Sequence, residues 1–133
     1  MRIIKKVALA VFKDKKMLQV RTNKHEKIFF TLGGKFEEGE DDLACLKREV
    51  KEEIDCEIEP NSIKFLKEFE DVAHGYEDTL LNVRLYEGNL IGEPKPSSEI
   101  VEIKYMDSKD KENLSVIAKR TIFPWLKKHG YIN

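Results

Sequence analysis

The sequence contains few of the features that mark specialised protein classes. It has only 2 cysteines and 4 prolines among 133 residues, which excludes a disulfide framework and a proline-rich segment. The formal net charge is −1, so no bulk electrostatic attraction to nucleic acid or to a membrane surface is expected. There is no apolar run of transmembrane length, and the N-terminal residues lack a signal-peptide hydrophobic region. We therefore expect a cytoplasmic protein with no membrane or nucleic-acid partner.

The two cysteines do not suggest a metal site or a crosslink. Cys45 and Cys56 lie on or next to one expected helix and are too far apart along it to form a disulfide. Neither belongs to a CxxC or Cys/His pattern, so zinc is not expected. The lysines are scattered rather than gathered beside aromatic residues, and we expect them on the solvated surface: Lys5, Lys6, Lys13, Lys15, Lys16, Lys127 and Lys128.

The remaining composition is that of a globular domain. With 133 residues and 41% hydrophobic residues, the chain is expected to form one domain over 1–133 with a real core. Alternating and β-branched stretches predict strands over 3–12, 17–21, 28–32, 63–72, 79–86 and 100–106. Polar, glycine and proline residues predict turns or loops at 13–16, 60–62, 74–78 and 88–98. Helices are expected over 41–54 and from Ser115 to about His129, the second with a kink or break at Pro124.

The most informative stretch runs from Gly34 to Cys56. It places a glycine turn ahead of a helix on which Glu49, Glu52 and Glu53 share an arc roughly 100° wide. The expected core stripe of that helix is separate and comprises Leu43, Leu46, Val50 and Ile54. Carboxylates crowded on one helix face repel one another. A hard divalent cation bound by their oxygens would convert that repulsion into attraction.

This stretch resembles the Nudix box, G-x5-E-x7-R-E-U-x-E-E-x-G-U, in which U is aliphatic. The residues that match in register are Gly34, Glu40, Arg48, Glu49, Val50, Glu52 and Glu53. Two positions depart from the pattern. Asp55 replaces a glycine where the helix should end in a left-handed residue, which Asp tolerates better than most residues. Cys56 replaces the last aliphatic residue and suits that place as a small hydrophobe.

The resemblance implies an α/β fold, the Nudix-type α/β/α sandwich with a mixed central sheet, and Mg²⁺ or Mn²⁺ as cofactor. It implies that Gly33 offers a backbone carbonyl to the metal and that Glu52 and Glu53 are the main metal carboxylates. Glu49 is either a third ligand or the general base. Arg48 orients Glu49, and Glu40 is a supporting or metal-side carboxylate. Lys35 is either a surface lysine or a cation that neutralises a leaving phosphate.

Other site residues are expected outside the box. A further carboxylate from a late loop is expected to join the metal site, with Glu99 the first candidate and Glu102 the second; an ordinary exposed acid is the alternative for both. His74 and Tyr76 lie in a loop that could face the substrate, and Arg21 could contact a phosphate; ordinary surface positions are the alternative for each. Phe29 or Phe30 could stack on a base, although aromatic residues in strands more often belong to the core.

The resemblance also implies the reaction class, hydrolysis of a nucleoside diphosphate linked to another group. By elimination of other branches of the family, the favoured substrate is a nucleoside triphosphate, cleaved to monophosphate and pyrophosphate. The alternatives are ADP-ribose, a dinucleoside polyphosphate, or a module that senses a nucleotide without cleaving it. The intact set of box acids argues against the last of these. Monomer and homodimer are both left open.

Overall fold

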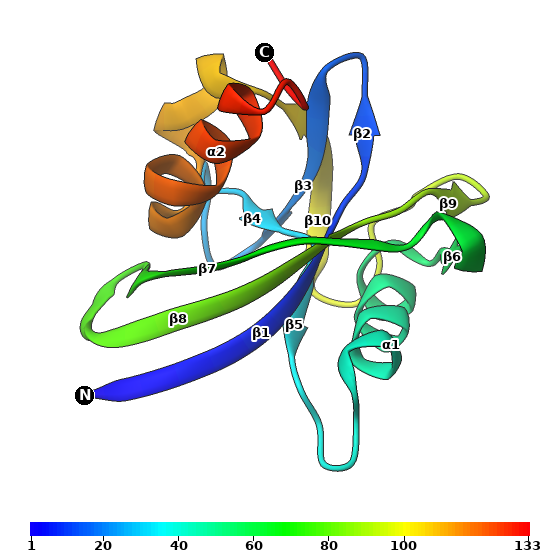
Figure 1. Cartoon of the computed structure of the whole chain (residues 1–133), viewed down its shortest axis with the longest axis horizontal. Coiled ribbons are helices and arrows are strands. Elements are labelled where there is room, and N and C mark those ends of the chain that lie inside the picture. The colour runs from blue at the N-terminus through cyan, green and yellow to red at the C-terminus, as the bar shows by residue number, and fades with distance from the viewer.

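The computed structural model describes residues 1–133, and its central strand is β1 (Arg2–Ala10). The main sheet has the strand order β5-β1-β8-β7 and is completed by β5 (Gly33–Lys35), β7 (Lys64–Ala73) and β8 (Tyr76–Glu87). β1 runs parallel to β8, whereas the other neighbouring pairs are antiparallel. The predicted mixed sheet is therefore confirmed, and Figure 1 shows it crossing the middle of the molecule.

A second sheet is formed by β10 (Ile100–Met106), β3 (Lys16–Thr22) and β2 (Phe12–Lys13), with β4 (Phe30–Thr31) paired to β3. The turn between β2 and β3 has positive φ at Asp14 and Lys15, the geometry that suits the twist of a tight hairpin. A small third sheet pairs β6 (Glu57–Ile58) with β9 (Leu90–Ile91). It lies beside the C-terminal end of α1 (Asp42–Ile54).

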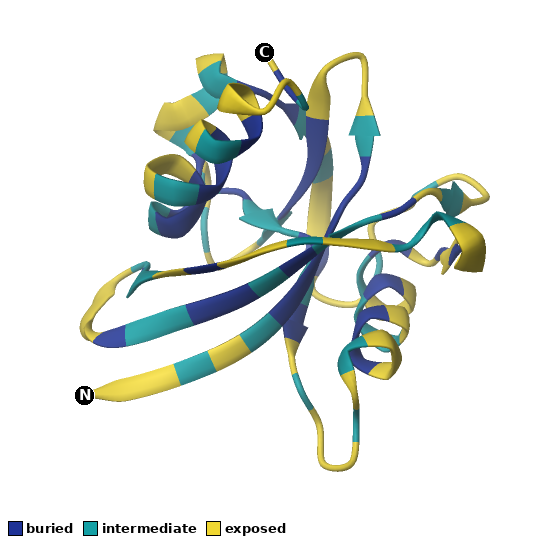
Figure 2. Ribbon diagram, in the orientation of Figure 1, coloured by how far each residue is buried: buried dark blue, intermediate teal, exposed yellow.

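Hydrophobic residues pack on both faces of β1, because neighbouring side chains of a strand point to opposite sides. Val7 and Leu9 belong to the cluster beneath α1, whereas Ala8 and Ala10 belong to the cluster beneath the C-terminal helical segment. That segment is helical from residue 116 to 128. It contains a π-helical turn, η3 (Ala118–Ile122), followed by α2 (Phe123–Lys128). Figure 2 shows the buried sheet between the two helical layers, so the sandwich is confirmed.

Both ends of α1 are fixed by their own side chains and backbone. Asp41 caps the N-terminus, where its Oδ1 accepts from the Ala44 N–H at 2.8 Å. Asp55 ends the helix with φ 55° and ψ 42°, which confirms the left-handed conformation expected there. The predicted core stripe is corrected at one position. Leu43 is 42% exposed, and Cys45 is buried instead.

Short strands account for most of the other corrections. The expected glycine turn forms strand β5. Of the expected strand 28–32, only Phe30–Thr31 is a strand. The polar loop 74–78 shrinks to a tight turn at His74 and Gly75, because Tyr76 already begins β8. The loop 88–98 contains β9, and 60–62 and 108–113 form the 3-10 helices η1 (Pro60–Ser62) and η2 (Ser108–Asn113). Strands of two or three residues are too short to show a period of hydrophobicity.

The C-terminal segment stays helical through Pro124, so the break considered there does not occur. The helix type changes from π to α next to Pro124, which lies in the first turn of α2, where its missing N–H costs little. Cys45 and Cys56 are both free and buried. None of the helices is long and apolar enough to cross a membrane.

Candidate active site

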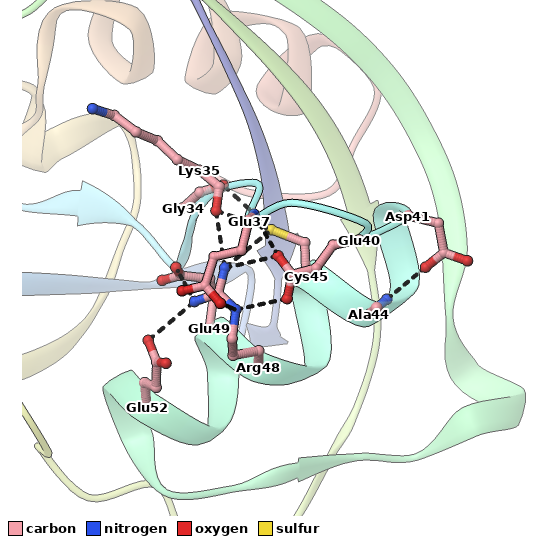
Figure 3. Close-up of polar contacts among 10 residues, drawn as sticks. All are labelled: Gly34, Lys35, Glu37, Glu40, Asp41, Ala44, Cys45, Arg48, Glu49 and Glu52. Carbon is pink, nitrogen blue, oxygen red and sulfur yellow. Dashed lines mark hydrogen bonds and ion pairs between the residues drawn. The ribbon is translucent and has the colours of Figure 1, made fainter.

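Arg48 is the centre of the polar network on α1 (Figure 3). Its Nε and Nη2 donate to both oxygens of Glu40, at 2.7 and 2.9 Å. Its Nη1 donates to Glu49 at 2.9 Å and to Glu52 at 3.2 Å, and Nη2 also donates to the Lys35 carbonyl at 3.0 Å. The hydrogen bonds from Arg48 lower the pKa of Glu40 to about 2. One guanidinium thus joins the helix to the segment that precedes it and aligns Glu49 with Glu52.

Glu53 is held from the strand side. Its Oε1 accepts from the Gly33 N–H at 3.0 Å, so the structure shows a supporting role for the Gly33 amide; metal ligation by the Gly33 carbonyl stays a prediction. Desolvation by burial raises the pKa of Glu53 to about 8, and the neighbouring Glu49 and Glu52 charges act in the same direction. The Gly33 amide and Lys6 oppose this shift only in part. A nearby cation would favour the ionised form of a carboxylate in this position and so lower its pKa.

Gly34 leaves space for the Glu49 carboxylate, which any side chain at this position would displace. A Cβ built on Gly34 would lie 2.5 Å from Glu49 Cδ and within 2.7 Å of both carboxylate oxygens. Glu49 is partly buried there, and desolvation raises its pKa, while Arg48 opposes the rise. The β5 backbone and the Arg48 side chain therefore confine the Glu49 carboxylate from two sides.

The carboxylates open onto a cavity of about 280 Å³, which we call the carboxylate pocket; it is lined by Thr22, Glu49, Glu52, Glu53, Ser98, Glu99 and Ile100. The structure distinguishes the two late candidates for the metal site, Glu99 and Glu102. Glu99 lines the pocket, whereas Glu102 pairs with Arg21 at 2.9 Å and does not line it. The structure brings Glu99, from the turn before β10, to the acids of α1.

The donor set of the carboxylate pocket fits a hard divalent cation. Its charged groups are carboxylates, and oxygen ligands of this kind suit Mg²⁺ and Mn²⁺. No three acidic, histidine or cysteine side chains are already gathered into a closed cluster. Glu52 and Glu99 are exposed and can turn, whereas Glu53 is held by Gly33. The acids can thus supply the ligands, with side-chain rotation needed to complete the site.

A second cavity of about 440 Å³, the apolar pocket, is lined in part by β5 and has 10 hydrophobic residues among the 19 that line it. Phe30, His25 and His74 form an aromatic group on its wall. The ring centroids of Phe30 are 4.9 Å from His25 and 5.9 Å from His74. His74 is positioned by the Val116 N–H, which donates to its Nδ1 at 3.2 Å. Desolvation, with His25 and Lys119, lowers the pKa of His74 and favours the neutral ring.

Several expected substrate residues line the apolar pocket, namely Phe30, Lys35, His74 and Tyr76. Tyr76 stands at its edge and is 66% exposed. Two other expectations find no support in the geometry. Phe29 is a core residue, and Arg21 is engaged by Glu102 and by the His25 carbonyl; neither lines the carboxylate pocket or the apolar pocket.

Of the titratable residues that line the apolar pocket, sequence reasoning missed two, Lys6 and His25. Lys6 was expected on the solvated surface, and that is wrong, because the residue is half-buried and lines the pocket. The alternation of β1 could have revealed it, since Lys6 shares a face with Ile4 and Ala8. For His25, which lies outside any strand, the sequence offers no comparable signal.

Comparison with known families agrees with this geometry. The sequence model of the NUDIX domain matches residues 4–126. The chain belongs to the Nudix family. As a Nudix domain it has three acids of the box on α1 and the fourth, Glu40, just before the helix. The family supports a hydrolase that acts on pyrophosphate bonds. No curated relative matches the chain by sequence.

Solved structures share this Nudix fold at low sequence identity. The E. coli ORF135 protein has a TM-score of 0.74 and 17% identity, with 98% of this chain and 94% of that chain covered. The E. coli dihydroneopterin triphosphate pyrophosphohydrolase has a TM-score of 0.72 and 14% identity, with 98% and 100% covered. A UDP-X diphosphatase has a TM-score of 0.74 and 17% identity, with 98% and 65% covered. At these identities the likeness establishes the fold alone.

Proposed function

We propose that this Nudix hydrolase cleaves a nucleoside triphosphate to the monophosphate and pyrophosphate, with Mg²⁺ or Mn²⁺ as cofactor. The observation that carries the proposal is the hydrogen bond that links the two pockets at Gly33 of β5. Gly33 lines the apolar pocket, and its N–H holds Glu53, which lines the carboxylate pocket. A nucleotide has the same two-part character, because an aromatic base is joined to a charged polyphosphate.

In this proposal, residues of the carboxylate pocket bind the metal and carry out the chemistry, and residues of the apolar pocket bind the nucleoside. Glu52, Glu53 and Glu99 would hold the divalent cation, which when bound would screen the phosphate oxygens and lower the pKa of a water. Arg48 holds Glu49 at the edge of this site, where Glu49 serves as general base or as a further ligand. Lys35 lines the apolar pocket and offers a charge to the phosphates. Phe30, His74 and Tyr76 would hold the base.

Two observations bear on the choice of substrate: the size of the apolar pocket and the descriptions of two structural neighbours. A cavity of about 440 Å³ is in the range of small-molecule sites and suits one nucleoside better than two. One of the structural neighbours is described as a triphosphate pyrophosphohydrolase and another as a diphosphatase of UDP-X. The first description favours a triphosphate here, and the second keeps a nucleoside diphosphate linked to another group as the runner-up.

The test is a panel of the common ribo- and deoxyribonucleoside triphosphates, an oxidised guanine triphosphate, ADP-ribose and a dinucleoside polyphosphate, each with Mg²⁺. Products are identified by phosphorus NMR, with Glu53→Gln as the inactive control. We expect a monophosphate and pyrophosphate from at least one triphosphate. Orthophosphate and diphosphate as the sole products would overturn the mechanism. Cleavage of ADP-ribose without triphosphate turnover would replace the substrate, and binding without any cleavage would indicate a sensing module.

A further inference from the structure

Lys6 and Lys35 form an unusual pair of cations in the wall of the apolar pocket. They are direct cross-strand partners in the antiparallel pairing of β1 with β5, and both line the apolar pocket. Like charges directly opposite one another in a sheet destabilise it. Neither lysine ammonium takes part in an ion pair or a hydrogen bond of the structure, although ten ion pairs join other residues. The pair is therefore maintained without a partner from the protein.

Lys6 lines the apolar pocket and also interacts with charges of the carboxylate pocket. Burial and the charge of Lys35 lower its pKa, whereas the charges of Glu53 and Glu49 raise it. Glu53 and Glu49 both line the carboxylate pocket, so the ammonium of Lys6 interacts electrostatically with Lys35 and with these two acids. Ile4 and Ala8, its neighbours on the same face of β1, line the apolar pocket with it.

We propose that Lys6, with Lys35 as its second cation, binds the phosphate group that joins the nucleoside to the rest of the substrate. This inference rests on the proposed nucleotide substrate. A base in the apolar pocket and a divalent cation among the carboxylates leave the first phosphate at the β5 boundary, beside these two lysines. An anion there replaces the repulsion between two ammonium groups with two charge-assisted hydrogen bonds. Lys6 is then a specificity residue, because it distinguishes a nucleotide from a nucleoside.

The chain offers a matched control in Lys5. It is the preceding residue of the same strand, is exposed and points to the opposite face. Lys6→Met keeps the apolar stem and removes the charge, and Lys5→Met makes the same chemical change outside the pocket. Lys6→Arg restores the charge. Thermal unfolding of all three should stay close to wild type, and Lys6→Met should gain slightly as the repulsion from Lys35 is relieved.

The measurement is calorimetric binding of the four common ribonucleoside monophosphates and of their nucleosides, at low salt and without divalent metal. Wild type should bind its preferred monophosphate at least tenfold more tightly than the matching nucleoside. Lys6→Met should remove that difference and leave nucleoside affinity unchanged, whereas Lys5→Met should keep it and Lys6→Arg should recover most of it. Because a hydrogen bond to a charged group contributes roughly tenfold or more to affinity, the effect is well within range.

The inference is overturned if Lys6→Met binds the monophosphate as well as Lys5→Met does, or if it weakens nucleoside and monophosphate equally. It is also overturned if no monophosphate binds wild type more tightly than its nucleoside. None of these outcomes depends on turnover. A wild-type enzyme that binds monophosphates through Lys6 but cleaves no triphosphate would contradict the proposed function and leave this assignment standing.

Discussion

The carboxylate pocket and the apolar pocket are linked by the hydrogen bond from Gly33 to Glu53 but are built in opposite ways. Three of the acids that line the carboxylate pocket, Glu49, Glu52 and Glu53, come from one helix over five consecutive positions. The apolar pocket collects its lining from segments as distant as Ile4 and Ile122. The first is therefore a local motif that can be read from the sequence. The apolar pocket depends on tertiary contacts, and no sequence pattern marks the residues that line it.

The two pockets are also held by different forces. Arg48 and Gly33 position the carboxylates through hydrogen bonds, whereas rings and aliphatic side chains form most of the apolar wall. Substitution in the carboxylate pocket should therefore affect turnover more than substrate binding. Substitution in the apolar pocket should affect KM more than kcat. The four experiments that follow test this division, from the largest expected effect to the smallest.

The strongest test removes one charge from the helix. Glu53→Gln, and separately Glu52→Gln, should lower kcat with Mg²⁺ by about a hundredfold or more while the protein stays folded, because each loses a charged ligand. Glu57→Gln is the control, since Glu57 is exposed on β6 and lines neither pocket. Steady-state kinetics and circular dichroism provide the measurements. Near-normal turnover in both variants would place the metal site elsewhere, and full activity of wild type in excess EDTA would exclude a metal altogether.

The second test uses pH in the metal-free protein. Folding raises the pKa of Glu53 from 4.5 to about 8, so the folded state binds its proton more tightly than the unfolded state does. The stabilising effect is present below pH 4.5 and is lost as pH rises toward 8. We compare the free energy of unfolding of wild type with that of Glu53→Gln. After a discount for partial exposure, the difference (wild type minus variant) should be roughly 2 kcal/mol lower at pH 8.5 than at pH 5.

Urea unfolding of the two proteins at both pH values measures this difference, and subtracting one from the other cancels groups that titrate alike, such as His74. A difference that does not change with pH would mean that Glu53 is not desolvated. Added Mg²⁺ should remove the penalty at pH 8.5, because a bound cation favours the ionised carboxylate.

The third test concerns the aromatic wall. Phe30→Ala should raise KM for the preferred nucleotide by roughly tenfold and change kcat little, because stacking on a base contributes about 1–3 kcal/mol. Phe65→Ala is the control, since Phe65 is 44% exposed on β7 and lines neither pocket. A fall in kcat with unchanged KM would show that the pockets do not divide binding and chemistry in this way.

The smallest effect is expected at the late carboxylate. Glu99→Gln should raise the Mg²⁺ concentration for half-maximal activity by roughly fivefold, since Glu99 faces the acids of α1 from an exposed turn. Glu102→Gln should leave it unchanged, because its carboxylate is engaged by Arg21. Magnesium titrations of the two variants decide between them. The reverse pattern would mean that Arg21 releases Glu102 when metal binds.

The contrast also explains what the sequence could predict. The helix limits and the match to the Nudix box follow from local spacing, so α1, its left-handed end at Asp55 and the clustering of its acids were accessible. Leu43 was misplaced because periodicity gives a face but not its exact edge. β5 and β9 escaped prediction because two or three residues gain their order from a partner strand. Lys6 was missed because its charge suggested solvent, and only the pairing of β1 with β5 turns it toward a pocket.

The left-handed residue at the end of α1 has a practical use in protein engineering. Asp55 holds φ 55° and ψ 42° at a cost that glycine would not incur, and its one ion pair, with Lys51, is exposed. Asp55→Gly should therefore raise the free energy of unfolding by up to about 1 kcal/mol. Asp55 lines neither pocket. The substitution would provide a more stable starting protein for variant libraries in which residues of the apolar pocket are changed to alter substrate specificity.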